Sequence, residues 1–165
     1  MASFQAHIKQ AKKNLKILSE TSQKINDCWD WQVTISYYVA VHLMNARLAD
    51  KLNLHYKTHK DVKIALYNEY FACKIPDEIY TAYVSLENLS RRARYLCHED
   101  SEIPNETEYH TYDRHLKKAL SKLDIILNYF CIEHGLTFEK CAIDCLDIKS
   151  QILSNFYYKQ DLKVG

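Results

Sequence analysis

Cationic and imidazole side chains gather around residue 95, and their types suit phosphate chemistry. Arg91 and His98 are seven positions apart, close to two helical turns, so they share a face of a helix, and Arg94 lies one turn before His98. A histidine exchanges protons near neutral pH, and an arginine stabilises charge on a phosphate. The spacing thus predicts a candidate site around Arg91, Arg94 and His98, with Arg92 and Tyr95 as further candidate binding residues beside them.

A second polar group opens the next predicted helix. His110 and Arg114 lie there, and in an antiparallel bundle the start of one helix is near the end of the helix before it. We therefore expect both side chains to line the same opening as His98.

The same cations have a structural explanation. Positive side chains near the C-terminus of a helix are stabilised by the helix dipole, whether or not they bind anything. The run from Arg91 to Arg94, and His98 after it, fits that explanation as well as it fits a site.

Hydrophobic periodicity predicts the helices that must position these residues. The expected helices cover residues 3–24, 30–52, 58–71, 76–98, 108–134 and 138–157. Gly 2 and Pro 2 leave little material for tight turns, which disfavours sheet folds. We expect an all-α, up-and-down four-helix bundle with one or two extra short helices. It forms a single domain over residues 1–165, with its core over about 3–134 and a C-terminal helix over about 138–157.

Composition restricts the classes of function. The formal net charge of +1 excludes a globally basic nucleic-acid binder but not a local basic patch. The absence of a long apolar run and of a signal-peptide pattern predicts a cytoplasmic protein without a membrane partner. The six cysteines are then expected as reduced thiols, and a zinc site at Cys141, Cys145 and His134 is disfavoured by its spacing. No cofactor motif is present, so no cofactor is expected.

Three segments together resemble the small HEPN proteins. Residues 36–42 read Ser-Tyr-Tyr-Val-Ala-Val-His, residues 57–60 read Lys-Thr-His-Lys, and residues 91–95 read Arg-Arg-Ala-Arg-Tyr. The order and length of the expected helices agree over about four-fifths of the chain. The sequence departs from the family where Arg92 follows Arg91 and where Arg94 replaces an acidic residue before Tyr95.

The resemblance implies a bundle that pairs into a homodimer. Many HEPN proteins are metal-independent endoribonucleases of toxin–antitoxin, CRISPR or anti-phage systems, with an Arg and a His near the end of a bundle helix. The resemblance thus implies RNA cleavage by Arg91 and His98, or alternatively a non-catalytic module that binds RNA, a nucleotide, a nucleotidyltransferase or an antitoxin. A helical scaffold that binds no ligand is the remaining interpretation.

Overall fold

The computed structural model describes residues 2–25, 27–54, 56, 58–95 and 113–159. His98 and His110 lie outside these residues. The elements are, in order, α1 (Phe4–Lys24), α2 (Trp29–Leu52), α3 (His59–Tyr67), α4 (Asp77–Tyr95), α5 (Asp113–His134), β1 (Cys141–Ile143), a 3-10 helix η1 (Leu146–Ser150) and β2 (Phe156–Tyr158).

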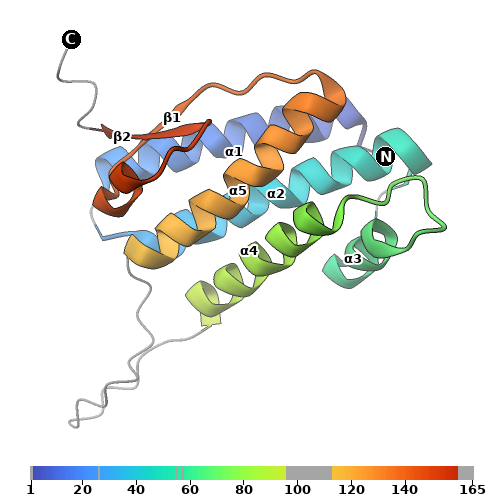
Figure 1. The fold of residues 1–165 in the computed structure, drawn as a ribbon, viewed down its shortest axis with the longest axis horizontal. Coiled ribbons are helices and arrows are strands. Elements are labelled where there is room, and N and C mark those ends of the chain that lie inside the picture. Colours follow the sequence, from blue (N-terminus) through green and yellow to red (C-terminus); the bar gives the residue numbers. More distant parts are fainter. Residues whose placement is uncertain (1, 26, 55, 57, 96–112, 160–165) are drawn as a thin grey trace, which may run out of the picture.

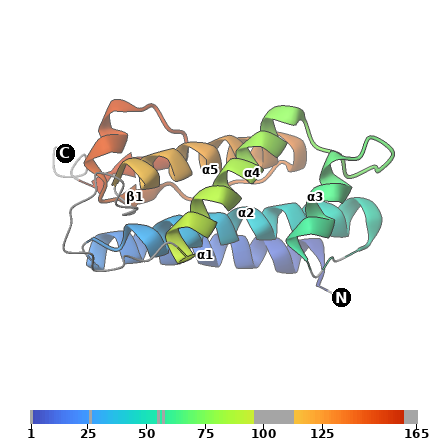
Figure 2. The ribbon, with the colours of Figure 1, turned by 90° about the horizontal axis from the view of Figure 1, so that it is seen from below.

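The four long helices run alternately in opposite directions along the long axis of the molecule (Figure 1). Helix α2 is central and packs against α1, α4 and α5, while α3 lies beside one end of α2 and α4. Figure 2 shows the same bundle from below, with α3 at the end opposite the C-terminal strands. The expected all-α bundle with short extra helices is therefore confirmed.

Sequence signals explain where the first two helices begin and end. The hydroxyl of Ser3 accepts a hydrogen bond from the N–H of Ala6 at 3.2 Å, which caps α1. Helix α2 is apolar nearly all round, as its central place requires, and ends at Asn53. Asn53 has a φ of 50°, the left-handed conformation that commonly ends a helix.

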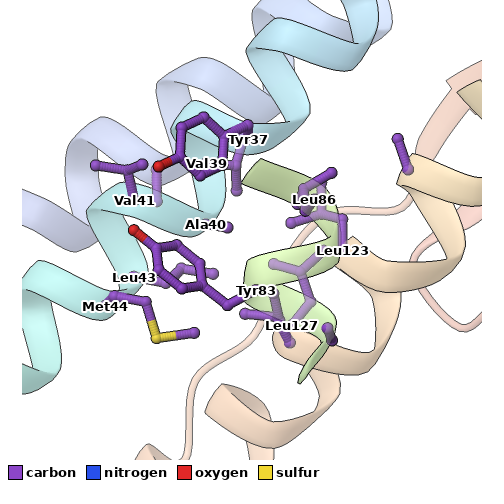
Figure 3. Close-up of a cluster of buried hydrophobic side chains, with 14 of the residues drawn as sticks. Tyr37, Val39, Ala40, Val41, Leu43, Met44, Tyr83, Leu86, Leu123 and Leu127 are labelled. Carbon is purple, nitrogen blue, oxygen red and sulfur yellow. The ribbon is translucent and has the colours of Figure 1, made fainter. Parts of the chain in front are cut away.

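The core lies where α2 meets α4 and α5 (Figure 3). Tyr37 and Leu43 from α2 and Tyr83 and Leu86 from α4 are fully buried, as is Leu123 of α5. Figure 3 shows the hydroxyls of Tyr37 and Tyr83 pointing to the same side, away from Leu123. The core thus holds a polar edge on the side of α2 and α4 that faces away from α5.

The expected helix over residues 138–157 is wrong. This segment instead forms β1, η1 and β2, and the two strands pair in parallel, with Cys141 opposite Phe156 and Ile143 opposite Tyr158. Cys141, Ala142 and Ile143 are consecutive and all buried, which a helix with one apolar face cannot achieve. Strand β1 packs against α1, where Ser19 Oγ donates to the carbonyl of Ala142 at 3.0 Å.

A buried carboxylate explains why this segment leaves the helical conformation. Asp124 of α5 is 6% exposed and accepts hydrogen bonds from the backbone N–H groups of Ser154 at 3.0 Å and Asn155 at 2.8 Å. The Asn155 side-chain amide donates to the same carboxylate at 2.9 Å. These backbone donors would be used up inside a helix, so Asp124 stabilises the extended form.

The remaining boundaries are close to those expected. Helix α3 ends at Tyr67 rather than at residue 71, and the loop after it is held by Arg47 of α2. The buried guanidinium of Arg47 donates to the carbonyls of Cys73 and Lys74, both at 2.8 Å.

Within the described ranges, none of the helices has the length and apolar character needed to cross a bilayer.

Candidate functional site

The C-terminal end of α4 carries the predicted arginines. Arg91 is exposed, and Arg94 is half-buried with its Nε donating to the carbonyl of Ser90 at 3.2 Å. The guanidinium of Arg94 also lies 5.1 Å from the centroid of the Tyr95 ring, which is 70% exposed. Arg94 is therefore held in place by two neighbours, while Tyr95 offers its ring to solvent.

The other predicted site residues are only partly located. Arg92 is half-buried on α4, and Arg114 is exposed at the second residue of α5. The end of α4 and the start of α5 lie at the same end of the bundle, as Figure 1 shows. His98 and His110 fall outside the described residues, so the predicted pairing of Arg91 with His98 stays a prediction.

A buried polar cluster lies directly behind Arg94. Tyr37 and Tyr83 are both fully buried, with their ring centroids 5.8 Å apart, and Glu87 is 7% exposed. The cluster forms because Tyr83, Glu87 and Arg94 follow one another at helical spacings of four and seven residues. Helix α4 therefore presents a phenol, a carboxylate and a guanidinium along one face toward α2.

Helix α3 completes this cluster. The Lys63 ammonium lies 2.7 Å from the Glu87 carboxylate, and the His59 ring lies 5.4 Å from the Tyr37 ring. His59 is placed by the preceding residue, since the Thr58 hydroxyl accepts a hydrogen bond from the Asp61 N–H at 3.2 Å and caps α3. We call Tyr37, His59, Lys63, Tyr83 and Glu87 the tyrosine–glutamate cluster.

The cluster joins the segments on which the family resemblance depends. Tyr37 belongs to residues 36–42, His59 to residues 57–60, and Arg94 to residues 91–95. These segments are far apart in the sequence, yet the structure brings them together around α2 and α4.

Burial governs the ionisation of the two core tyrosines. It raises the pKa of Tyr37 to about 12, with the Glu87 carboxylate adding to the shift and the Arg94 guanidinium opposing it. Burial also raises the pKa of Tyr83, and the negative forms of Tyr37 and Glu87 act in the same direction. Both phenols thus stay neutral at physiological pH, so the cluster cannot supply a phenolate base.

Sequence reasoning missed Lys63 and Glu87. The helical spacing of Tyr83, Glu87 and Arg94 was a usable signal for Glu87, but nothing local pairs Lys63 with it. The exposed His59 makes a ring contact with Tyr37 that no local pattern indicates.

A histidine pair occupies a different place in the bundle. The Nδ1 atoms of His7 and His42 lie 3.2 Å apart between α1 and α2. Near the end of α5, His134 stacks on Phe130 with centroids 5.2 Å apart. Within the described part of the chain, no group of three or more His, Cys, Asp or Glu side chains is placed to hold a metal ion.

The cysteines that the structure describes are free thiols. Cys73, Cys141 and Cys145 are buried, and burial raises the pKa of Cys141 to about 11. A thiol with so high a pKa is a poor nucleophile at neutral pH, so Cys141 serves as a small apolar residue.

Comparison of the chain with protein-family models, with curated proteins and with solved structures finds no match. The geometry of the site is therefore the basis for any proposed function.

Proposed function

We propose that this chain is a HEPN-type, metal-independent endoribonuclease that acts as a homodimer in a toxin–antitoxin or anti-phage defence system. The observation that carries the proposal is the C-terminal end of α4, where Arg91 is exposed and Arg94 contacts Ser90 and Tyr95. A guanidinium held before the substrate arrives needs no reorganisation to stabilise charge on a phosphate, which is the largest single contribution in many enzymes.

The proposed reaction uses two subunits. The His98 imidazole of one subunit accepts the proton of the RNA 2′-hydroxyl, and the 2′-oxygen attacks the adjacent phosphorus. The bond from phosphorus to the 5′-oxygen then breaks, and the protonated His98 of the other subunit donates a proton to that oxygen. Arg91 and Arg94 stabilise the negative charge on the phosphate during the attack. The products are a 2′,3′-cyclic phosphate and a free 5′-hydroxyl.

The exposed ring of Tyr95 favours a second function. An aromatic ring next to a guanidinium can stack on a base while the cation binds the phosphate, and this arrangement needs no catalytic group. The alternative proposal is thus a HEPN-type module that binds RNA or a nucleotide, or that serves a nucleotidyltransferase or antitoxin partner, without cleavage.

An RNase assay in EDTA distinguishes the two functions. If the chain is a nuclease, wild-type protein should cleave RNA to cyclic phosphate ends. Both His98→Ala and Arg91→Ala should then reduce the cleavage rate by about 100-fold or more. Lys74→Ala is the matched control, because Lys74 is an exposed cation before the first turn of α4 and should leave the rate unchanged. Circular dichroism verifies the fold of each variant.

Two results would reject the nuclease. One is the absence of cleavage by wild-type protein on any RNA tested, with binding retained and weakened by Tyr95→Ala. The other is cleavage that His98→Ala leaves unchanged. Light scattering gives the oligomeric state, and a monomer at the assay concentration would contradict the two-subunit site.

A further inference from the structure

A basic groove lies between α1 and residues 137–141. Its volume is about 1100 Å³. Five lysines and one aromatic ring are part of its lining: Lys9, Lys12, Lys13, Lys16, Lys140 and Phe138. Segment 135–140 runs back along α1 from the end of α5, which creates the second wall (Figure 1).

The lysines of α1 are not explained by helix stability. Residues 4–19 contain no Asp or Glu, so the first three of these lysines lack an acidic neighbour one turn earlier or later on the helix that could pair with them. Lys9 and Lys13 are four residues apart, as are Lys12 and Lys16, and like charges at this spacing destabilise a helix. The spacing of these lysines therefore costs some helix stability.

The acidic residues of the groove leave most of its charge in place. Glu20 lies 3.9 Å from Lys16 and 3.6 Å from Lys24, so it is shared between two exposed lysines. Glu139 is the other acidic residue in the lining, against five lysines. The groove therefore keeps a net positive charge on a chain whose net charge is only +1.

The groove combines a row of charges with apolar surface. Lys9 and Lys16 are seven residues apart along α1, so the row extends over about 10 Å at the helical rise per residue. The half-buried Phe138 stands opposite, with Lys12 Nζ 5.8 Å from its ring centroid. Flexible lysines beside an aromatic ring suit a polymer whose phosphates and bases alternate along its length.

We propose that this groove binds a single strand of RNA, with the lysines of α1 and Lys140 on the phosphates and Phe138 against a base. An acidic peptide would match the charge, but it has no counterpart for the aromatic ring among the lysines. This surface is separate from the arginines, because α1 packs on α2 and β1 while α4 packs on α2 and α5, with α1 and α4 at opposite edges of the bundle (Figure 1).

The proposal goes beyond the proposed function and does not depend on catalysis. The probe is therefore a fluorescein-labelled oligouridylate of about 12 nucleotides with 2′-O-methyl groups, which cannot be cleaved through a 2′-hydroxyl. Fluorescence anisotropy gives its Kd at several salt concentrations. The test variant is Lys9→Ala plus Lys13→Ala, and the control is Lys60→Ala plus Lys74→Ala, two exposed lysines on other elements.

Wild-type protein and the control should bind alike, and the test variant should bind about tenfold more weakly. The slope of log Kd against log salt should fall by about 1.4, because two phosphate contacts are lost from a single strand. Phe138→Leu should weaken binding without changing that slope, since a ring carries no charge.

Three results would overturn the proposal: no binding by wild-type protein, an equal loss in the control, or binding of a poly-glutamate peptide as tight as that of the oligonucleotide. The last would assign the groove to an acidic protein segment. The cleavage assay described above is scored separately, so loss of cleavage in His98→Ala with oligonucleotide binding intact supports both sites.

Discussion

The Glu87 carboxylate lies 2.7 Å from the Lys63 ammonium, and this ion pair joins the buried face of α4 to α3. This ion pair lies within the tyrosine–glutamate cluster. Because Glu87 is buried and Lys63 is partly exposed, the two partners differ in what their loss would cost.

Replacing Lys63 with Met should therefore destabilise the fold by about 2 kcal/mol, since it leaves a buried carboxylate without its partner. Urea denaturation measures the loss. The double variant Lys63→Met plus Glu87→Leu should recover most of the stability, because no charge remains buried. A double variant as unstable as the sum of the two single variants would show that the pair is not coupled.

The buried tyrosines predict a loss of stability in alkaline solution. The pKa of Tyr37 is raised from 10.0 to about 12 in the folded protein, so the unfolded chain releases its phenolic proton first as the pH rises. Stability contributed by the neutral phenol is complete below pH 10 and is lost as the pH rises through the folded pKa. Tyr37→Phe should unfold at a higher pH than wild type. Ultraviolet absorbance of tyrosinate during alkaline titration measures both events, and an early, fully reversible titration of all tyrosines would contradict the prediction.

His134 predicts a loss of stability in acid. Burial lowers its pKa below 6.5, with Arg47 and Lys51 adding to that direction and Asp50 and Glu133 opposing it. The unfolded chain therefore binds a proton first as the pH falls, so the contribution of the neutral imidazole is complete above the unfolded pKa and is lost as the pH falls through the folded one.

His134→Phe keeps the contact with Phe130 and should reduce the acid sensitivity between pH 6.5 and the lower folded pKa. Proton NMR titration of the His134 ring, together with thermal unfolding at several pH values, measures both effects. An unchanged pH dependence in the variant would assign the acid sensitivity to other groups.

Asp124→Ala should release the C-terminal strands. The carboxylate accepts three hydrogen bonds from residues 154 and 155, and its loss should cost about 3 kcal/mol. The amide of Cys141, which donates to the Asn155 carbonyl at 2.8 Å, should then exchange its hydrogen much faster than amides of α2. Asn128→Ala removes one neutral donor to Asp124 and one acceptor for the Asn155 side chain, and it should have a smaller effect because the carboxylate keeps its bonds to residues 154 and 155. Equal exchange of the Cys141 amide in both variants would contradict the role given to Asp124.

Local sequence patterns were sufficient to predict the helical bundle but not the conformation of the C-terminal segment, residues 138–157. The stripes of α1, α4 and α5 are periodic, so their helices and faces follow from the sequence. The conformation of residues 138–157 depends on Asp124, which lies some thirty residues from the groups it binds, and no local pattern reports such a partner.

The candidate site divides in the same way. The sequence pattern places Arg91 and Arg94 near the C-terminal end of a helix, and both lie near the end of α4. Helical spacing could not reveal that Lys63 pairs with Glu87, or that residues 137–141 lie opposite the lysines of α1 and form a groove with them. Both contacts depend on the packing of elements that are distant in the sequence.

The contacts of the C-terminal segment, residues 138–157, have a consequence for folding. Its anchors are Asp124 on α5 and Ser19 and Ser22 on α1, where the Ser22 hydroxyl accepts from the Asp144 N–H at 2.9 Å. This segment bridges the two helices, so it can reach its observed place only when α1 and α5 are both in position. Cleavage near residue 136 should therefore leave the long helices packed, with one side of the bundle uncovered.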